Sequence, residues 1–449
     1  MDIRIPESFL ENIREEFGEP QAVRLSELLN GASPVTVRVN PMKVGDRQDI
    51  LDLPTDCSVK MEGRSEFGRV LERRPLFTLD PLFHAGCYYV QEASSMAIES
   101  QKEIYASLQG GSADGKVRIL DLCAAPGGKS THLLSIFRNC PGAMLVSNEV
   151  IRARATVLAE NIAKWGAANV VVSNNDPADF GAFEGFFDMI VVDAPCSGEG
   201  MFRKDPASRQ EWSPEHVAQC AARQRRIVAD IWPALRRGGI MLYSTCTFNH
   251  WENRDNLNWI ASELGAEVLH SEQCFPGEQY GEGFFYGIVR KSGDEPHLSI
   301  KDPLRGAAVK PFKDKVDFVE AGFVCYRKGD LVKGYPAPVA DDMIWAESHL
   351  RCVSAGVAVA SVMEGAKGRT MVPEVDIALS EALRRESFPE VEVPLEDALK
   401  FLRKDPLAFP SAPKGYLLLF YKGVPLGFVK NIGNRSNNLW PQGWRIRNV

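Results

Sequence analysis

The sequence predicts an α/β protein built around a doubly wound, mostly parallel sheet, and two observations indicate this. From residue 117 to about residue 291, short β-branched apolar runs alternate with amphipathic stretches, which is typical of a parallel sheet with helices on both faces. Two of these runs end in polar loops that carry a cysteine, Asp193–Gly198 and Ser244–Thr247. Because parallel strands end at the same edge of a sheet, both loops are expected beside the crevice where such sheets bind ligands.

The composition is that of an ordinary globular chain. Of its 449 residues, 45% are hydrophobic and 25% are charged, and this length suggests about three domains. The formal net charge is −7, so a polyanion would have to be bound by local basic patches. The ten cysteines form no C-x-x-C pair, which favours a reducing compartment over a disulfide framework or a zinc site.

The sequence contains no targeting or membrane pattern that we could identify. Its start lacks a basic stretch followed by an apolar one. No apolar run approaches the ~18 residues that cross a bilayer. We therefore expect a cytoplasmic protein that makes no membrane contact. The few His residues are scattered, and no metal site is expected.

The amino-terminal region, residues 1–110, is predicted to be mixed α+β. Residues 7–17 have a helical apolar pattern that Gly18 is placed to end. Val35–Pro41 alternates as a strand does and closes with Asn-Pro. Tyr88–Met96 offers aromatic and amide groups, which taken alone predict packing followed by a helix cap.

The central region, residues 111–295, contains the predicted sheet. Strands are expected at 117–122, 143–148, 169–173, 187–192 and 240–243. Helices are expected at 130–138, at 152–165 and from 213 to about 237. Ser213 and Pro214 are typical of a helix start, and Gly238 with Gly239 would stop the last helix.

The remainder is predicted to be a linker and two small units. Residues 296–320 are charged and lack apolar periodicity, as a linker does. An intermediate α+β domain at 321–390 would hold a hairpin around Lys328–Asp330 and a helix from Val372 to Arg385. A mainly β module at 391–449 would hold two strands joined at Lys422 and Gly423.

The loop Asp121–Ser130 joins the first strand to the first helix, where such folds hold a nucleotide-like cofactor. A P-loop would need glycine where Cys123 stands, and the G-x-G-x-x-G fingerprint is also absent. The small residues, the proline and the two glycines still allow the backbone to approach a ligand closely. A cofactor without phosphates fits better, and S-adenosylmethionine is the common one.

Two acidic residues strengthen this choice. Glu149 ends the second strand, where a carboxylate can accept hydrogen bonds from both ribose hydroxyls. Asp176 follows the third strand, and its carboxylate can accept a hydrogen bond from an adenine amino group. Either side chain could instead be a helix cap or a solvated loop acid.

Cys196, Cys246 and Asp193 are expected to share one pocket. A thiolate is a strong nucleophile, so two thiols and a carboxylate suit covalent chemistry on a pyrimidine ring. The alternative is a pair of buried structural cysteines, since free cysteine is among the most buried residue types. The flanking Pro, Ser, Thr and Gly residues favour a loop.

Three motifs follow one another along the chain: Asp121–Lys129, Asp193–Gly198 and Ser244–Thr247. Together they resemble the motifs of the RNA 5-methylcytosine methyltransferases, a family that includes bacterial ribosomal RNA enzymes and the eukaryotic NOL1/NOP2/Sun proteins. Arg38–Pro41 and Gln91–Ser94 look like the amino-terminal motifs of this family. The tail, with Leu426–Lys430 and Asn438–Pro441, is similar to the PUA-like extension of the F-type bacterial 16S ribosomal RNA enzymes. This last similarity favours ribosomal RNA over transfer RNA as the substrate.

The resemblance implies a Rossmann-like, S-adenosylmethionine-dependent methyltransferase sheet with a PUA-like carboxyl-terminal module. It implies methylation of C5 of a cytosine in 16S ribosomal RNA, free or in the small ribosomal subunit. Cys246 would be the nucleophile, Cys196 would assist release of the product, and Asp193 would hold the cytosine edge at N3 and N4. The residues implied for the cofactor are Cys123, Ala124, Ala125, Pro126, Gly127, Gly128, Lys129, Glu149, Asp176 and Asp193, and more loosely Arg154.

Three alternatives remain at this level. In DNA cytosine-5 methyltransferases the Pro-Cys residue is the nucleophile, so Cys196 could hold that role, although Thr245 and Cys246 would then have none. The substrate could be transfer RNA. The chain could also be a cofactor-binding ribosome assembly factor whose catalysis is incidental.

RNA contacts are expected from basic side chains interleaved with aromatic ones, because these suit a backbone groove with base stacking. The residues nominated are Arg38, Asn40, Arg203, Lys204, Lys430, Arg435, Trp440, Trp444 and Arg445. For each residue of the tail, the alternative is a solvated face, or a tryptophan in the core of a small β module.

Overall fold

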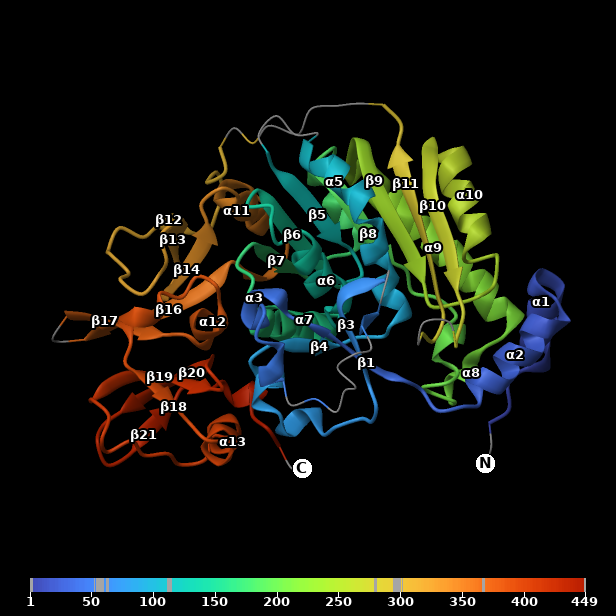
Figure 1. Ribbon diagram of the computed structural model, residues 1–449. Helices are drawn as coiled ribbons and strands as arrows, with labels where there is room; N and C mark the ends of the chain where they lie inside the picture. Colours follow the sequence, from blue (N-terminus) through green and yellow to red (C-terminus); the bar gives the residue numbers. More distant parts are fainter. Residues whose placement is uncertain are drawn as a thin grey trace.

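The computed structural model describes residues 3–447 except 52, 54–59, 62–63, 111–114, 278–280, 294–299, 301 and 366–367. Within this part of the chain there are four sheets: a central eight-stranded sheet, an amino-terminal sheet, and two sheets near the carboxyl terminus (Figure 1). The amino-terminal sheet and the last of these share one hydrophobic core. No helix of the described residues is long and apolar enough to cross a membrane.

The central sheet has the strand order β10-β11-β9-β8-β5-β6-β7-β15. Its parallel neighbours are β5 (Val117–Asp121), β6 (Ala143–Asn148), β7 (Val170–Ser173), β8 (Phe187–Asp193) and β9 (Leu235–Thr245). Antiparallel pairs add β10 (Ala266–Cys274), β11 (Phe284–Lys291) and β15 (Cys352–Ala355). The strand order reverses between β5 and β8, so the crevice predicted for a ligand lies at their carboxyl ends. The predicted doubly wound fold is confirmed.

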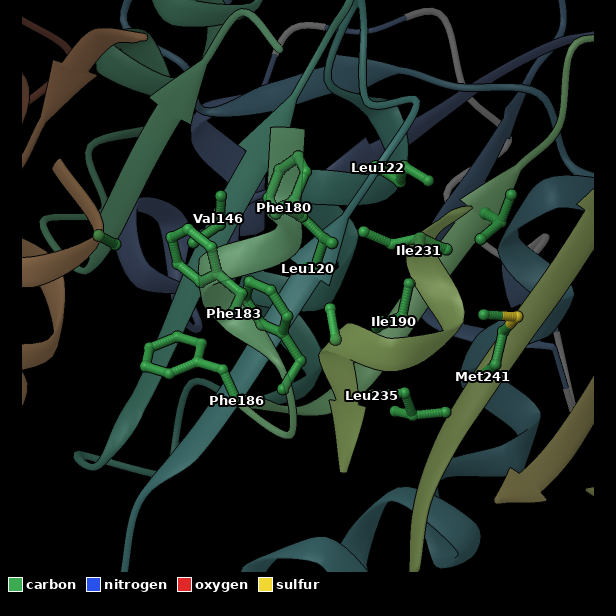
Figure 2. Packing of buried hydrophobic residues seen from close by; sticks show 14 of the residues in the cluster. Leu120, Leu122, Val146, Phe180, Phe183, Phe186, Ile190, Ile231, Leu235 and Met241 are labelled. Atoms are coloured by element: carbon green, nitrogen blue, oxygen red, sulfur yellow. The ribbon is translucent and has the colours of Figure 1, made fainter. Parts of the chain in front are cut away.

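Helices cover both faces of this sheet. Leu120, Val146 and Ile190 point to one face, where they pack with Phe183 and with α9 (Pro214–Ile231) (Figure 2). The alternate strand residues pack on α6 (Gly128–Ile136) and α7 (Arg152–Trp165), because successive side chains of a strand point to opposite faces. A further helix, α10 (Arg254–Glu263), lies between β9 and β10 in the chain.

The amino-terminal region folds largely as predicted. It begins with α1 (Glu7–Phe17) and α2 (Glu19–Leu29), and Gly18, with φ of 87°, ends α1. A four-stranded sheet of order β2-β3-β1-β4 follows. Its strands are β1 (Val35–Val39), β2 (Lys60–Met61), β3 (Ser65–Leu71) and β4 (Tyr88–Val90), and its short helices are α3 (Pro41–Val44), α4 (Pro81–His84) and α5 (Lys102–Gly110). In Figure 1 α1 and α2 lie beside α8 (Ser208–Glu211), and Phe9 of α1 contacts Phe202 and Trp212.

The carboxyl-terminal third contains both predicted hairpins. These are β13 (Phe323–Lys328) with β14 (Leu331–Pro336), and β19 (Gly415–Tyr421) with β20 (Val424–Asn431). The other elements are β12 (Lys310–Pro311), α11 (Ala340–His349), β16 (Val357–Gly365), β17 (Gly368–Pro373), α12 (Val375–Leu379), β18 (Glu390–Glu392), α13 (Leu395–Arg403) and β21 (Ser436–Asn438).

Two predicted helices have the wrong limits. The expected helix from Val372 to Arg385 is wrong, because β17 pairs with β16 as far as Pro373 and only Val375–Leu379 is α-helical. The helix predicted to reach about residue 237 ends at Ile231. Gly239 lies inside β9, where an added Cβ would come within 2.9 Å of the carbonyl oxygen of Asp188. This glycine permits close strand packing and does not stop a helix.

The segment predicted as an intermediate domain contributes a strand to the central sheet. Its strand β15 pairs with β7, with Ala355 opposite Val171. Arg118 of β5 also donates a 3.1 Å hydrogen bond from Nε to Oδ2 of Asp342 on α11. The predicted boundary near residue 110 falls beside the stretch 111–114, and the one near residue 295 falls within the stretch 294–299. Both stretches lie outside the described residues, and the division into domains stays a prediction.

Candidate active site

A cavity of about 760 Å³ lies over the carboxyl ends of the parallel strands. Each of β5 to β9 delivers at least one residue to its wall, directly at the strand end or in the loop that follows. These residues are Cys123, Glu149, Asp176, Asp193 and Cys246. The doubly wound order therefore gathers side chains from five separate loops at one crevice.

The two thiols meet in this cavity, as expected. Asp193 and Ser244 are opposite each other in the β8–β9 ladder, so the loops that follow leave the sheet side by side. The Sγ atoms of Cys196 and Cys246 are 3.1 Å apart. The next residues along each loop also meet, with Ser197 Oγ 3.1 Å from Thr247 Oγ1.

A buried carboxylate that sequence reasoning missed holds the two cysteine loops together. Glu252 is 0% exposed. Its carboxylate accepts hydrogen bonds from the backbone N–H of Ser197 at 3.0 Å, from Gln224 Nε2 at 2.7 Å and from Asn249 Nδ2 at 2.8 Å. Glu199 also joins the two loops. Its carboxylate accepts hydrogen bonds from the backbone N–H groups of Phe248 and Asn249 at 2.7 and 3.1 Å. No periodic pattern marks these residues, because their role depends on a loop-to-loop contact.

Gly200 allows the closest approach of the two loops. Its N–H donates a 2.7 Å hydrogen bond to the carbonyl oxygen of Cys246. An added Cβ would lie 2.8 Å from that oxygen and 3.0 Å from the carbonyl oxygen of Gly283. Only glycine fits this position without displacing the loop that carries Cys246.

Asp193 is held between a cation and a hydroxyl. Lys129 Nζ is 2.8 Å from its Oδ2, and Ser244 Oγ donates a 2.9 Å hydrogen bond to its Oδ1. Burial alone would lower the pKa of Lys129, but the attraction of the Asp193 carboxylate outweighs burial and raises this pKa. The Lys129 ammonium also lies 4.8 Å from the centre of the Phe284 ring.

The cysteines of the cavity have different environments. The hydrogen bond with Cys246, followed by burial, raises the pKa of the Cys196 thiol well above its ordinary value. Burial also raises the pKa of Cys123. Both thiols therefore keep their protons at neutral pH, and Cys196 can donate its hydrogen to the sulfur of Cys246.

The opposite end of the cavity fits S-adenosylmethionine. The Glu149 carboxylate accepts a 2.9 Å hydrogen bond from the N–H of Ile151 and lies 3.3 Å from Arg154 Nη1. Val150 and Ile151 line the cavity although they are apolar and 57% and 50% exposed, which suits packing against a planar base. The cations nearest the loop, Lys129 and Arg154, are paired with carboxylates, so this end suits a cofactor without phosphates.

The predicted cofactor residues divide into two groups. Cys123, Ala125, Pro126 and Lys129 line the cavity with Glu149, Asp176 and Asp193. Ala124, Gly127 and Gly128 are not among the lining residues and shape the loop. Ala124 donates a 2.8 Å backbone hydrogen bond to Asn148, and Gly127, with φ of 116°, precedes α6. Asp176 is also a helix cap, since its carboxylate accepts a hydrogen bond from the N–H of Ala178 at 3.2 Å.

Three of the predicted RNA contacts are wrong, because packing buries the residues. Arg38 and Asn40 are 0% exposed and Trp440 is 1% exposed. Arg38 bonds to residues of α6, and Asn40 caps α3 and donates to the carbonyl oxygens of Gly86 and Trp165. Trp440 packs on Phe401 in the carboxyl-terminal module.

The other predicted RNA contacts differ in accessibility. Arg203 bonds internally to the carbonyl oxygen of Ala32 and lies 3.6 Å from Glu282. Trp444 is half-buried beneath Lys164. The remaining four residues are exposed and stay predictions: Lys204, Lys430, Arg435 and Arg445.

Two arginines at the cavity mouth were missed. Arg223 and Arg226 line the cavity from α9 and are exposed. Residues three apart on a helix lie on one face, and this spacing was the signal available in the sequence. Among the described residues, no group of three or more His, Cys, Asp or Glu side chains is arranged to hold a metal ion.

Comparison with known proteins identifies the family. Residues 112–290 match the family model described as 16S rRNA methyltransferase RsmB/F. Residues 5–93 match the N-terminal domain of 16S rRNA methyltransferase RsmF, and residues 388–446 match the methyltransferase RsmF PUA domain. A ribosomal RNA small subunit methyltransferase F from Pectobacterium atrosepticum is 31% identical over 395 residues, which cover 80% of this chain and 77% of the relative. The chain belongs to the 16S rRNA methyltransferase RsmB/F family.

Other RsmB/F relatives extend this likeness over nearly the whole chain. The enzyme of the same name from Shigella boydii is 30% identical across 98% of this chain and 96% of its own length. The crystal structure of NSun6 from Pyrococcus horikoshii with SFG, an S-adenosylmethionine analogue, has a TM-score of 0.53 at 18% identity and covers 66% of this chain and 100% of that one.

A methyltransferase homolog from the same organism has a TM-score of 0.52 at 23% identity and covers 64% of this chain and 100% of that one. These two structures show the fold alone. With the family matches, they establish an S-adenosylmethionine-dependent methyltransferase that has a Rossmann-like sheet and a PUA domain.

Proposed function

We propose that this protein methylates C5 of a cytosine in 16S ribosomal RNA in the cytoplasm, with Cys246 as the nucleophile. The observation that carries the proposal is the pair of thiols, 3.1 Å apart, beside Asp193 in the cavity that also fits the cofactor. The names of the relatives supply the class of RNA.

The environments of the thiols support Cys246 over Cys196 as nucleophile. A thiol with a raised pKa is a poor source of thiolate, and the contact with Cys246 keeps the proton on Cys196. A Cys196 S–H group that donates to the sulfur of Cys246 stabilises negative charge on that sulfur. The alternative in which Cys196 attacks gives Cys246 no role.

In the first step Cys246 Sγ forms a bond to C6 of the cytosine, and the electrons of the C5–C6 double bond make C5 nucleophilic. Asp193 accepts a hydrogen bond from the N4 amino group, and it would repel the O4 oxygen of uracil. S-adenosylmethionine, when bound, supplies the methyl group that C5 takes.

In the second step the C5 proton must leave so that the double bond can form again. After Cys246 Sγ is bonded to carbon, it no longer carries the charge that holds the proton on Cys196. Cys196 then gives its own proton to solvent, and the resulting thiolate accepts the proton from C5. The C5–C6 double bond re-forms, and Cys246 leaves as the thiolate.

The cation group at the mouth supports RNA as the substrate. Lys204, Arg223 and Arg226 are exposed where a nucleotide would enter. The target base must leave any stack to reach Cys246, so a loop or a single-stranded segment is the expected substrate. Phosphates on either side of the flipped nucleotide would contact these cations.

A trapping assay tests this proposal. The wild type, Cys196→Ala, Cys246→Ala and the control Cys140→Ser would be incubated with total RNA and S-adenosylmethionine and run on a denaturing gel. We expect a stable slow-migrating adduct only with Cys196→Ala, because this variant forms the Cys246–C6 bond but cannot release it.

The trapped RNA would then be sequenced, and 16S ribosomal RNA is the expected result. An adduct that requires Cys196 would make Cys196 the nucleophile. An adduct with transfer RNA would contradict the proposed substrate. If none of the variants forms an adduct, the covalent mechanism is wrong.

A further inference from the structure

The starting point is Arg38, a fully buried cation at the junction of the amino-terminal region and the catalytic sheet. The residue lies on β1 and is 0% exposed. Its guanidinium donates to Gln91 Oε1 at 2.8 Å, Ser135 Oγ at 2.8 Å, Thr131 Oγ1 at 2.5 Å and the carbonyl oxygen of Gly128 at 3.4 Å. One face of the guanidinium lies 4.5 Å from the centre of the Trp165 ring.

All of these hydrogen-bond partners are neutral groups. Burying a cation that makes no hydrogen bond to a carboxylate is unfavourable. This burial lowers the pKa of Arg38 to about 9, and the attraction of the nearby Glu99 carboxylate offsets only part of the effect. An apolar side chain of similar size would avoid that cost. A buried arginine in such a place is therefore best explained by the positions of the groups that it holds.

Those groups belong to two walls of the reaction cavity. Gly128 and Thr131 are in the first turn of α6, which begins where the cofactor loop ends. Gln91 is followed by Glu92, which lines the cavity, and Gln91 Nε2 donates at 3.3 Å to Ser95, which lines it too. A single guanidinium thus spans the cofactor loop and the amino-terminal wall.

A second contact joins the same two regions without reaching the cavity wall. His132 Nε2 of α6 is 2.9 Å from Glu99 Oε2, and Ser65 Oγ of β3 donates to the same oxygen at 2.6 Å. Neither His132 nor Ser65 is among the lining residues of the cavity. This contact offers a matched comparison, because it stabilises the junction but does not hold the first turn of α6 against Gln91.

We propose that Arg38 is a positioning residue: it couples the amino-terminal region to the cofactor loop and so sets the affinity for S-adenosylmethionine, without touching RNA. The proposal rests on the cofactor site and does not depend on which nucleotide is methylated. It replaces the role in RNA binding that the sequence predicted for this residue.

The test uses full-length Arg38→Ala and Arg38→Lys and measures binding of S-adenosylhomocysteine by calorimetry. We expect each variant to bind it about tenfold more weakly or worse, because an ammonium cannot reproduce the planar fork of donors. Low concentrations of guanidinium ion should restore binding to Arg38→Ala, since the ion can occupy the vacated site between the acceptors and Trp165. Arg38→Lys keeps the charge, and it tests the dependence of cofactor affinity on the guanidinium group if Arg38→Ala does not fold.

RNA affinity measured at several salt concentrations distinguishes a role of Arg38 in positioning the cofactor loop from a role in contacting RNA. Arg38→Ala should keep the salt dependence of the wild type, as should the control Arg73→Ala, an exposed residue of the same region. A salt slope reduced by about one, with cofactor affinity unchanged, would establish an RNA contact and overturn the proposal.

His132→Gln separates positioning from simple stability. We expect it to lower the thermal midpoint and to leave the affinity for S-adenosylhomocysteine close to that of the wild type. If His132→Gln weakens this affinity as much as Arg38→Ala does, and guanidinium ion restores neither variant, the role of Arg38 is only structural. A folded Arg38→Lys that binds S-adenosylhomocysteine like the wild type would also overturn the proposal.

Discussion

At the scale of single residues, Asp121 shows how the cofactor loop is supported from below. It ends β5, is 0% exposed and accepts a 2.7 Å hydrogen bond from Ser130 Oγ. Ser130 in turn accepts a 2.9 Å hydrogen bond from Ser147 Oγ of β6. Burial raises the pKa of Asp121 to about 7, from an ordinary value of 3.8.

This shift predicts a particular dependence of stability on pH. An acid whose pKa is raised in the folded state contributes stability below its unfolded pKa, and this contribution is lost as the pH rises through the folded value. For Asp121 this contribution to stability is lost between pH 3.8 and about pH 7. Asp121→Asn keeps an acceptor for Ser130 but does not titrate, so its thermal midpoint should fall less than that of the wild type over this window. The thermal midpoints of the two proteins would be measured from about pH 4 to about pH 8. If they fall in parallel, the raised pKa of Asp121 is contradicted.

At the scale of elements, α11 is attached to β5 by a buried ion pair. Arg118 and Asp342 have side chains that are 3% and 2% exposed. The Arg118 guanidinium also lies 4.7 Å from the centre of the Phe186 ring. This contact, with the pairing of β15 on β7, joins the segment after residue 321 to the catalytic sheet.

Asp342→Ala should therefore destabilise the whole protein and not a separate domain. Removing one partner of a buried pair typically costs about 3–5 kcal/mol, and we expect a loss of this size in urea unfolding, with one cooperative transition. Asp342→Asn, which keeps the size and the acceptor oxygen, should lose less. A loss under about 1 kcal/mol, or a separate early transition, would show that the segment is attached more loosely.

At the scale of the whole molecule, an acidic protein has to bind RNA through local cations. The formal net charge is −7, yet Arg223 and Arg226 lie at the cavity mouth, and Arg435 and Arg445 are exposed on the carboxyl-terminal module. Neutralising a phosphate releases counterions, so each contact adds about 0.9 to the slope of log affinity against log salt on duplex and about 0.7 on single strands.

Charge reversal of either pair should weaken RNA binding and flatten its salt dependence. The measurement is RNA affinity at several salt concentrations for the two double variants. The double variant Arg73→Glu with Arg305→Glu, at two exposed arginines outside both regions, is the control for the change in net charge. If a double variant behaves like the control, its arginines do not contact phosphate.

The strands of the central sheet could be predicted because both faces of that sheet are buried. Such strands are continuous apolar runs, and β5 to β8 lie close to their predicted limits. The short β15 could not be found in this way, because the partner of Cys352–Ala355 is a distant strand, β7. The pattern from Val372 to Arg385 suggested a helix, but pairing of β17 with β16 decided otherwise.

The sequence by itself determined which side chains gather at the candidate active site. Asp193, Cys196 and Cys246 follow apolar strands, and parallel strands end at one edge, so their meeting could be predicted from local patterns. Only the tertiary structure decided which polar residues are accessible and which are internal. Arg38 resembled an RNA contact but is buried against α6, Arg223 and Arg226 reach the cavity mouth, and Glu252 joins two distant loops. The physical reason is that exposure and loop-to-loop contacts arise from the packing of segments far apart in the chain, which no local pattern records.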